Sequence, residues 1–113
     1  MTRGTAASSA RDEVRPVVPK LIELTDAIVY DDVWQRPGLS KRDRSLITVA
    51  ALVSLYRTDQ LRSHIKRALA NGVTPEEIGE ALTHLAVYAG WPTAMTAARI
   101  AKSVFDEGPA RRS

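Results

Sequence analysis

Two sharply marked helix boundaries in the second half of the sequence constrain the fold more than any other feature. A break at Asn71-Gly72 is followed by Thr74-Pro75-Glu76-Glu77, in which a capping threonine, a proline and a glutamate occupy the positions that open a helix. This helix is predicted to end at Gly90, because glycine commonly terminates helices. Pro92 then opens a last helix, predicted to continue through Phe105. This half of the chain is therefore predicted to contain two consecutive helices joined by a tight turn.

The first half of the sequence carries signals of the same kind. Ser40 stands three residues before Asp43, which is close to a capping box, and either Thr58 or Asp59 is expected to cap the helix that ends at Asn71-Gly72. No segment shows the alternation of a strand bounded by hairpin turns. The predicted fold class is therefore all-α, a single-domain bundle of five to six helices. The predicted helices cover residues 20–30, 41–56, 60–71, 74–89 and 92–105.

The ends of the chain differ in composition from its middle. Residues 1–15 are small and polar and lack periodicity, so they are predicted to be a disordered tail ahead of a helical domain at 16–108. The formal net charge of +3 comes from the ends, because residues 20–108 hold eleven basic and eleven acidic side chains. Residues 109–113 form a basic C-terminal tail. A neutral body with basic ends is a poor surface for nucleic acid, so no nucleic-acid partner is predicted, and an anionic partner of the tails is the weakest hypothesis.

The absence of cysteine excludes several classes of protein at once. Without Cys the chain has no disulfide, no thiolate metal site and no thiol nucleophile, and it fits the reducing cytoplasm, which is its predicted location. No secretion signal is recognisable, and the longest apolar run, Leu46 to Tyr56, has 11 residues against the ~20 that a membrane span needs. No membrane association is predicted. A chain of 113 residues with an alanine-rich last helix is instead expected to form a homo-oligomer.

His64 is the leading candidate for chemistry. It lies beside the apolar stripe of the helix predicted over residues 60–71, and Gln60 and Arg57 lie one and two turns before it on the same side. Histidine titrates near neutral pH and is the commonest general acid or base, so these three residues are predicted to line one groove. The alternative is a structural histidine, half-buried and hydrogen-bonded to a carbonyl group. Arg44, in the basic first turn of an earlier helix, either attracts an anion or is solvated.

A second group of candidates lies around the helix end at Gly90. His84 stands one turn before Tyr88, and Trp91 follows the glycine. The two aromatic side chains are expected either to wall a pocket or to contact another subunit. His64 and His84 are too far apart in the sequence to form a metal-ligand motif, so no metal site is predicted.

Three segments carry a resemblance to a known family: RPGLSKRDRSLITVAAL, HIKRALANGVTPEEI, and AVYAGWPTAM with RIAKSVF. They are similar to the carboxymuconolactone decarboxylase family, and the resemblance covers about residues 33–107. The alkyl hydroperoxidase D-like peroxidases of this family carry two cysteines before a histidine, at positions that correspond to Arg57 and Gln60. Ser45 stands near the place of their proton-relay glutamate. The chain therefore resembles the decarboxylase branch and departs from the thiol peroxidases.

The resemblance implies an all-α, alkyl hydroperoxidase D-like protomer that assembles into a trimer or hexamer. It also implies decarboxylation, without a cofactor, of a small carboxylate substrate such as a carboxylated lactone or a related unsaturated acid. In this scheme Arg57 or Arg44 holds a carboxylate, and His64 delivers a proton after CO2 is lost.

His64 and Gln60 are the predicted catalytic positions, although decarboxylase members tend to carry an acidic residue where this chain has Gln60. The alternative function is a non-catalytic binding or accessory subunit with the same fold, which this departure favours. The predicted substrate-binding residues are Arg57, Arg44, His84, Tyr88 and Trp91.

Overall fold

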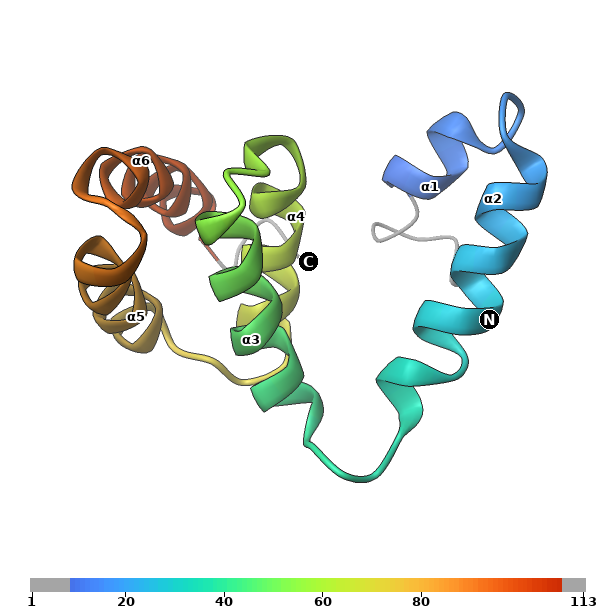
Figure 1. The fold of residues 1–113 in the computed structure, drawn as a ribbon, viewed down its shortest axis with the longest axis horizontal. Helices are drawn as coiled ribbons and strands as arrows, with labels where there is room; N and C mark the ends of the chain where they lie inside the picture. The colour runs from blue at the N-terminus through green and yellow to red at the C-terminus, as the bar shows by residue number, and fades with distance from the viewer. Residues whose placement is uncertain (1–8, 109–113) are drawn as a thin grey trace. The chain divides into compact units, whose positions relative to one another are not determined.

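A computed structural model describes residues 9–108 of the chain (Figure 1). These residues form six α-helices with short π-helical and 3-10 segments, and none of them lies in a β-strand. The predicted all-α fold class is therefore confirmed. The chain divides into two compact units, Met1–Leu39 and Ser40–Ser113. The helical domain predicted at 16–108 spans this boundary and stays a prediction.

In the first unit, helix α1 spans Ser9–Val14 and α2 spans Pro19–Leu24. The chain continues directly from α2 into a π-helix, η2, over Thr25–Tyr30, and a 3-10 turn, η3, covers Val33–Gln35. The helix predicted over residues 20–30 is therefore present, but its second half is wound more widely than an α-helix.

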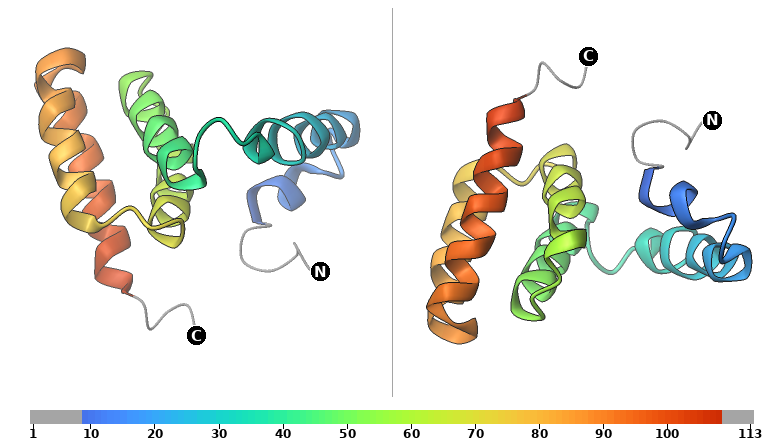
Figure 2. Two further views of the ribbon diagram at one scale, coloured as in Figure 1. Left: turned by 90° about the horizontal axis from the view of Figure 1, so that it is seen from below. Right: turned by 90° about the horizontal axis from the view of Figure 1, so that it is seen from above.

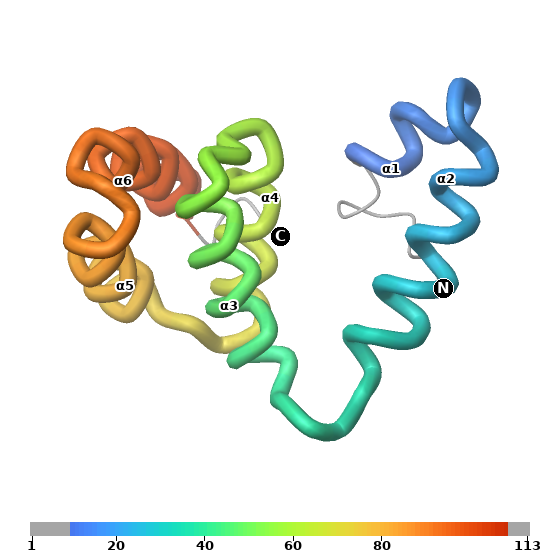
Figure 3. The backbone as a smooth tube through the Cα atoms, in the orientation of Figure 1, coloured from blue at the N-terminus to red at the C-terminus, as the bar shows by residue number. Residues whose placement is uncertain are grey.

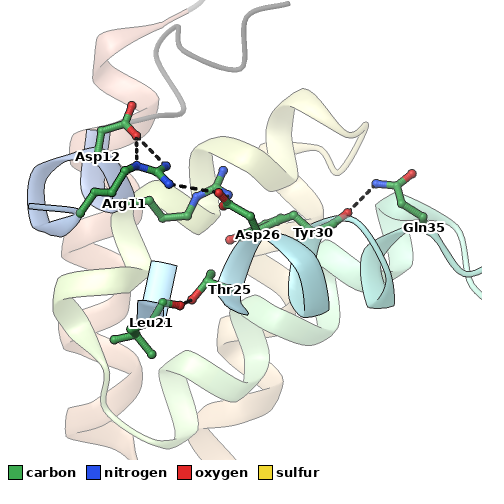
Figure 4. Close-up of polar contacts among 8 residues, drawn as sticks. Arg11, Asp12, Leu21, Thr25, Asp26, Tyr30 and Gln35 are labelled. Atoms are coloured by element: carbon green, nitrogen blue, oxygen red, sulfur yellow. Dashed lines mark hydrogen bonds and ion pairs between the residues drawn. The ribbon is translucent and has the colours of Figure 1, made fainter. Parts of the chain in front are cut away.

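Helix α1 lies within the predicted disordered tail. Residues 1–8 of that tail, and all of the basic tail at 109–113, lie outside the described residues. Residues 9–14 are instead helical, because side chains of this segment contact η2 (Figure 4). Arg11 forms an ion pair with Asp26, and its guanidinium group stands 4.1 Å from the centre of the Tyr30 ring. Arg15 adds a second ion pair to Asp26 at 3.3 Å.

The second unit contains four helices, each of which begins and ends within two residues of its predicted bounds. Helices α5 and α6 run side by side, and α3 packs against α4 (Figure 2). Gly90, with a φ of 114°, makes the turn between α5 and α6. The bounds are Lys41–Ser54 for α3, Thr58–Ala70 for α4, Pro75–Ala89 for α5 and Trp91–Glu107 for α6.

Local sequence explains where two of these helices begin. The Ser40 side chain accepts a hydrogen bond from the Asp43 backbone N–H at 3.0 Å and caps α3. Thr74 and Glu77 form a reciprocal capping box at the start of α5. Both caps were predicted from the sequence, and both are confirmed.

The start of α4 differs from the prediction. Neither Thr58 nor Asp59 caps this helix, because its N-cap is Arg57, whose side chain makes no capping hydrogen bond. The reason lies in the short bend that precedes α4 (Figure 3), where Tyr56 adopts a left-handed φ of 59°. The Arg57 backbone N–H donates to the Leu52 carbonyl at 2.8 Å and closes this bend. The helix therefore begins at Thr58, one residue earlier than a Thr58 cap and two residues earlier than an Asp59 cap would start it.

An aliphatic core joins the four helices of the second unit. Each helix contributes one apolar stripe, and Val73 adds to it from the loop between α4 and α5. Small alanine side chains on α6 allow close helix packing. The buried members are Val49, Val53, Leu61, Ile65, Ala68, Val73, Ile78, Leu82, Ala97, Ala101 and Val104.

Polar contacts fasten these helices at the margins of the core. Ser45 is 1% exposed, and its hydroxyl group accepts a hydrogen bond from the Asn71 side chain at 2.9 Å, which joins α3 to the end of α4. Lys66 and Glu107 pair at 3.2 Å and join α4 to α6. Across residues 9–108, every helix falls short of the length or the apolarity that a membrane crossing demands.

Candidate functional site

One side of α4 carries a line of polar side chains spaced alternately by three and four residues. This spacing places them on one face, because residues three and four apart are neighbours on a helical surface. The line runs from the N-cap to the C-cap of the helix, beside its buried residues. We call it the polar stripe; it consists of Arg57, Gln60, His64, Arg67 and Asn71.

His64 lies at the centre of the polar stripe and is partly buried. Its Nδ1 atom is enclosed and has no hydrogen-bond partner among the described residues, so the carbonyl-bound histidine of the structural alternative is not observed there. Burial lowers the pKa of His64 below its usual 6.5, and the positive charge of Arg67 lowers this pKa further. Both effects favour the neutral form of the imidazole.

The predicted partners of His64 differ in their burial. Arg57 and Gln60 are exposed and lie on the same side of α4 as His64, as the helical spacing predicts. Arg44 lies on α3, the helix that packs against α4, and is partly buried with its Nε atom enclosed. The polar stripe itself holds two arginines and no carboxylate, so its chemistry suits an anionic ligand.

The remaining predicted residues form a second group, on α5 and α6. The rings of His84 and Tyr88 lie 4.9 Å apart and are tilted by 34°. Tyr88 is 77% exposed and Trp91 is 63% exposed. Among the described residues, no hydrogen bond, ion pair or ring contact joins these three side chains to the polar stripe. A single pocket that includes both groups stays a prediction.

The second group belongs to a larger uncharged surface. Residues 81–98 contain no Asp, Glu, Lys or Arg, although charged residues stand on either side of them in the sequence. Two further large apolar side chains, Val87 and Met95, are 70% and 57% exposed in this stretch. We call this surface the uncharged end; it consists of Val87, Tyr88, Trp91 and Met95.

Within residues 9–108, no three His, Asp or Glu side chains come together as metal ligands would. A shallow cavity of about 310 Å³ is lined by Asp12, Arg15 and Pro16 of the first unit. It includes none of the predicted site residues, so the polar stripe remains the leading candidate.

Arg67 is the site residue that the sequence analysis overlooked. It follows His64 by one helical turn, is partly buried, and acts electrostatically on the imidazole. The three-and-four spacing that relates Arg57, Gln60 and His64 continues to Arg67, so the signal was present in the sequence. The burial of His64 and Arg67, which strengthens the effect of the Arg67 charge on the pKa of His64, could not be predicted from the sequence.

Comparison with known proteins assigns the chain to one family. The model of the carboxymuconolactone decarboxylase family matches residues 19–103. The chain is 42% identical over 78 residues to a 4-carboxymuconolactone decarboxylase of Acinetobacter baylyi, which covers 69% of this chain and 58% of that protein. It is 36% identical over 85 residues to the nitrosuccinic acid decarboxylase npaB of Metarhizium robertsii, with 75% and 59% covered.

A third relative is an uncharacterized 15.0 kDa protein of Paracoccus denitrificans, 30% identical over 101 residues, with 87% of this chain and 72% of that protein covered. The chain therefore spans less than two thirds of the length of the two decarboxylases that it matches.

Proposed function

Because the chain belongs to the carboxymuconolactone decarboxylase family, we propose that it is a cofactor-free decarboxylase. Its substrate class in this proposal is a small carboxylated lactone or a related unsaturated acid. The observation that carries the proposal is His64, a partly buried imidazole in a stripe that holds two arginines and no carboxylate. Two relatives that are named decarboxylases support the same class of reaction.

The arginines supply the first requirement, which is to hold an anion beside His64. A guanidinium group binds a carboxylate through two parallel hydrogen bonds and so fixes its orientation. Arg57 is exposed at the start of the polar stripe, and Arg44 lies on α3, the helix that packs against α4. Either residue is suited to hold the carboxylate that the reaction retains.

His64 supplies the second requirement, which is a proton. Decarboxylation breaks the bond between a carbon atom and its carboxylate, and the electron pair of that bond passes into the adjacent unsaturated system. The resulting dienolate-like anion is stabilised by nearby positive charge. The imidazolium form of His64 then gives one proton to carbon and becomes the neutral imidazole, which takes up a proton from solvent before the next turnover. Negative charge next to the imidazole favours its protonated form and offsets the effect of Arg67.

A non-catalytic binding or accessory subunit is the second candidate function. The observation that favours it is Gln60, which lies one turn before His64 where decarboxylase-type members tend to carry an acidic residue. An amide group cannot carry a proton at neutral pH, so a mechanism that needs a second proton carrier would fail. In the catalytic proposal, Gln60 keeps its predicted catalytic position by hydrogen-bonding the reacting substrate, and His64 transfers the proton alone.

The deciding experiment is a mass balance with γ-carboxymuconolactone as substrate. The purified protein is expected to release CO2 and to form the decarboxylated enol-lactone in equal amounts, as measured by NMR. His64→Gln should lower kcat/KM by about 10²–10⁴, the usual contribution of a positioned acid or base. Ser63→Ala, which changes the adjacent exposed residue, is the matched control and should retain full activity.

The two candidate functions give different results in this experiment. Binding of the lactone with no CO2 release would exclude the enzyme and support the accessory subunit. Full activity of His64→Gln would remove His64 from the chemistry and place the site elsewhere.

We also propose that the protein acts as a homo-oligomer, a trimer or a hexamer, in the cytoplasm. The uncharged end supports this part of the proposal, because its four large apolar side chains are exposed and favour contact with another apolar surface. Light scattering at micromolar concentration measures the assembly directly. A monomeric mass would contradict it.

A further inference from the structure

Tyr56 has no role in the mechanism above, although it directly precedes Arg57 at the start of the polar stripe. We propose that Tyr56 is a specificity-determining residue, whose aromatic ring packs on the flat, unsaturated part of the substrate while Arg57 holds a carboxylate. This inference rests on the proposed function, because it takes the polar stripe as the substrate site.

The backbone of Tyr56 adopts a conformation that tyrosine rarely takes. Its φ is 59°, and the other described residues with a positive φ are glycines, namely Gly72, Gly90 and Gly108. A Cβ atom in the left-handed region crowds the neighbouring backbone, so glycine is the favoured residue there. A tyrosine at this position is therefore less stable than a glycine would be.

The hydrogen bonds at the end of α3 require a left-handed residue but not a tyrosine. The Tyr56 N–H donates to the Val53 carbonyl at 3.0 Å, and the Arg57 N–H donates to the Leu52 carbonyl at 2.8 Å. These two bonds form a Schellman motif, in which a left-handed residue, usually glycine, ends a helix. The fold thus explains the backbone of Tyr56 and leaves its side chain unexplained.

The ring of Tyr56 gains little from the rest of the described structure. It is 57% exposed and is not part of the aliphatic core. Within residues 9–108, its side chain forms no hydrogen bond, ion pair or ring contact. Backbone strain of this kind is concentrated at binding and active sites. We infer from the strain and the exposure that the ring contacts a ligand.

The position of Tyr56 indicates which ligand its ring fits. Consecutive Cα atoms are about 3.8 Å apart, so a small acid held by the Arg57 guanidinium group can be reached by the Tyr56 ring. Residues 57–60 are all polar, which suits a small charged ligand better than an apolar subunit contact. Aromatic rings pack best on other flat π-systems, so Tyr56 should favour an unsaturated acid over its saturated counterpart.

The test compares 2-furoate with tetrahydro-2-furoate, which share their ring atoms and their single carboxylate and differ in the unsaturation of the ring. Dissociation constants are measured by NMR from the ring signals of His64, which are assigned by comparison with His64→Gln. The wild type is compared with Tyr56→Gly and Tyr56→Phe. Leu55→Ala is the matched control, because it removes the exposed apolar side chain next to Tyr56.

The wild type is expected to bind 2-furoate about 2–10-fold more tightly than tetrahydro-2-furoate, the usual gain from packing two π-systems. Tyr56→Gly should abolish this preference and yet raise Tm by about 2–5 °C, because glycine relieves the backbone strain. Tyr56→Phe should retain the preference, since it keeps the ring and loses only the hydroxyl group. Leu55→Ala should show the wild-type preference.

An unchanged preference in Tyr56→Gly would overturn the inference, and the proposed decarboxylase would survive with another basis for its specificity. Equal loss of affinity for both ligands would overturn it too, because it would indicate a structural effect. A lower Tm, or a smaller mass by light scattering, would assign the ring to packing or to a subunit contact instead.

If neither ligand perturbs His64 in the wild type, the polar stripe is not the substrate site and the inference fails. Release of CO2 from γ-carboxymuconolactone then decides the proposed decarboxylase separately. Should Tyr56→Gly not fold, the ratio of the two dissociation constants in Tyr56→Asn decides, because asparagine also tolerates the left-handed region and lacks the ring.

Discussion

The described part of the first unit buries two hydrophobic side chains, Ile22 and Trp34, whereas the second unit buries the other thirteen of the fifteen in the described structure. In the first unit the helices are joined instead by charge: Arg11 and Arg15 both bond Asp26, and Arg11 also stacks over Tyr30. One chain thus uses two ways of holding helices together. The stability of each unit should therefore depend differently on ionic strength.

The difference has a physical consequence for the response of each unit to salt. Apolar burial does not depend on charge, and salting-out ions strengthen it. Ion pairs weaken as ionic strength rises, the more exposed Arg15–Asp26 pair more than the Arg11–Asp26 pair. We therefore expect added sodium chloride to loosen the contacts of α1 with η2 before it affects the helices of the second unit.

The largest effect is expected in the aliphatic core. Ile65 is fully buried on α4, so Ile65→Ala should lower the free energy of unfolding by about 2–5 kcal/mol, through lost apolar burial and the cavity left behind. Urea denaturation followed by circular dichroism measures this change. Ile47→Ala serves as the control because Ile47 is 56% exposed, and it should change stability by about 0.5 kcal/mol or less. Equal effects of the two variants would contradict the assigned core.

A smaller and more local effect is expected from Asp26. Asp26→Ala removes the acceptor shared by Arg11 and Arg15, whose loss should cost about 1–3 kcal/mol. Hydrogen exchange should become faster in α1 and η2 and stay unchanged in α4. Glu23→Ala breaks only the exposed pair with Lys20 and should have almost no effect. Unchanged exchange in α1 and η2 would show that the first unit does not rely on these pairs.

Helix capping gives the next effect in size. Thr74→Ala should destabilise the second unit by about 1 kcal/mol, because it removes the side-chain acceptor for the Glu77 backbone N–H at the start of α5. Thr83→Ala is a matched control, since the Thr83 hydroxyl group bonds a carbonyl inside α5 rather than an orphan N–H. Thermal unfolding of both variants makes the comparison. A Tm of Thr74→Ala equal to that of Thr83→Ala would show that the capping box adds nothing.

The smallest effect concerns the titration of His64. Its pKa is lowered in the folded chain, so below about pH 6.5 the unfolded chain binds more protons than the folded one. The contribution of His64 to stability is therefore at its full value above pH 6.5 and is lost as the pH falls toward the lowered pKa. His64→Gln should flatten this part of the stability profile. A profile unchanged between the wild type and His64→Gln would show that the imidazole is not desolvated.

The two units also differ in how well the sequence predicts them. The capping box of Thr74 and Glu77 lies within one helical turn, so local residues are enough to locate the start of α5. Helix α1 was missed because its support, the pair of Arg11 with Asp26, joins residues fifteen positions apart. The π-helical winding of η2 also left no signal in the apolar spacing.

The candidate site likewise has features that the sequence predicts and features that depend on the packing of the helices. The common face of Arg57, Gln60 and His64 follows from helical spacing and was predicted. The enclosed Nδ1 atom of His64 and the influence of Arg67 depend on burial, which arises from the packing of several helices. Sequence spacing states which side chains share a face, but not how much water reaches them.

The bend at Tyr56 sets the direction of the polar stripe. Tyrosine in the left-handed region costs roughly 1–2 kcal/mol, yet three backbone hydrogen bonds, from Leu55, Tyr56 and Arg57, fix the chain there. The left-handed φ of Tyr56 and these three hydrogen bonds together fix the direction in which α4 leaves α3. The connection between α3 and α4 is rigid, so the two helices move together. The face of α4 that carries His64 therefore keeps its orientation relative to α3.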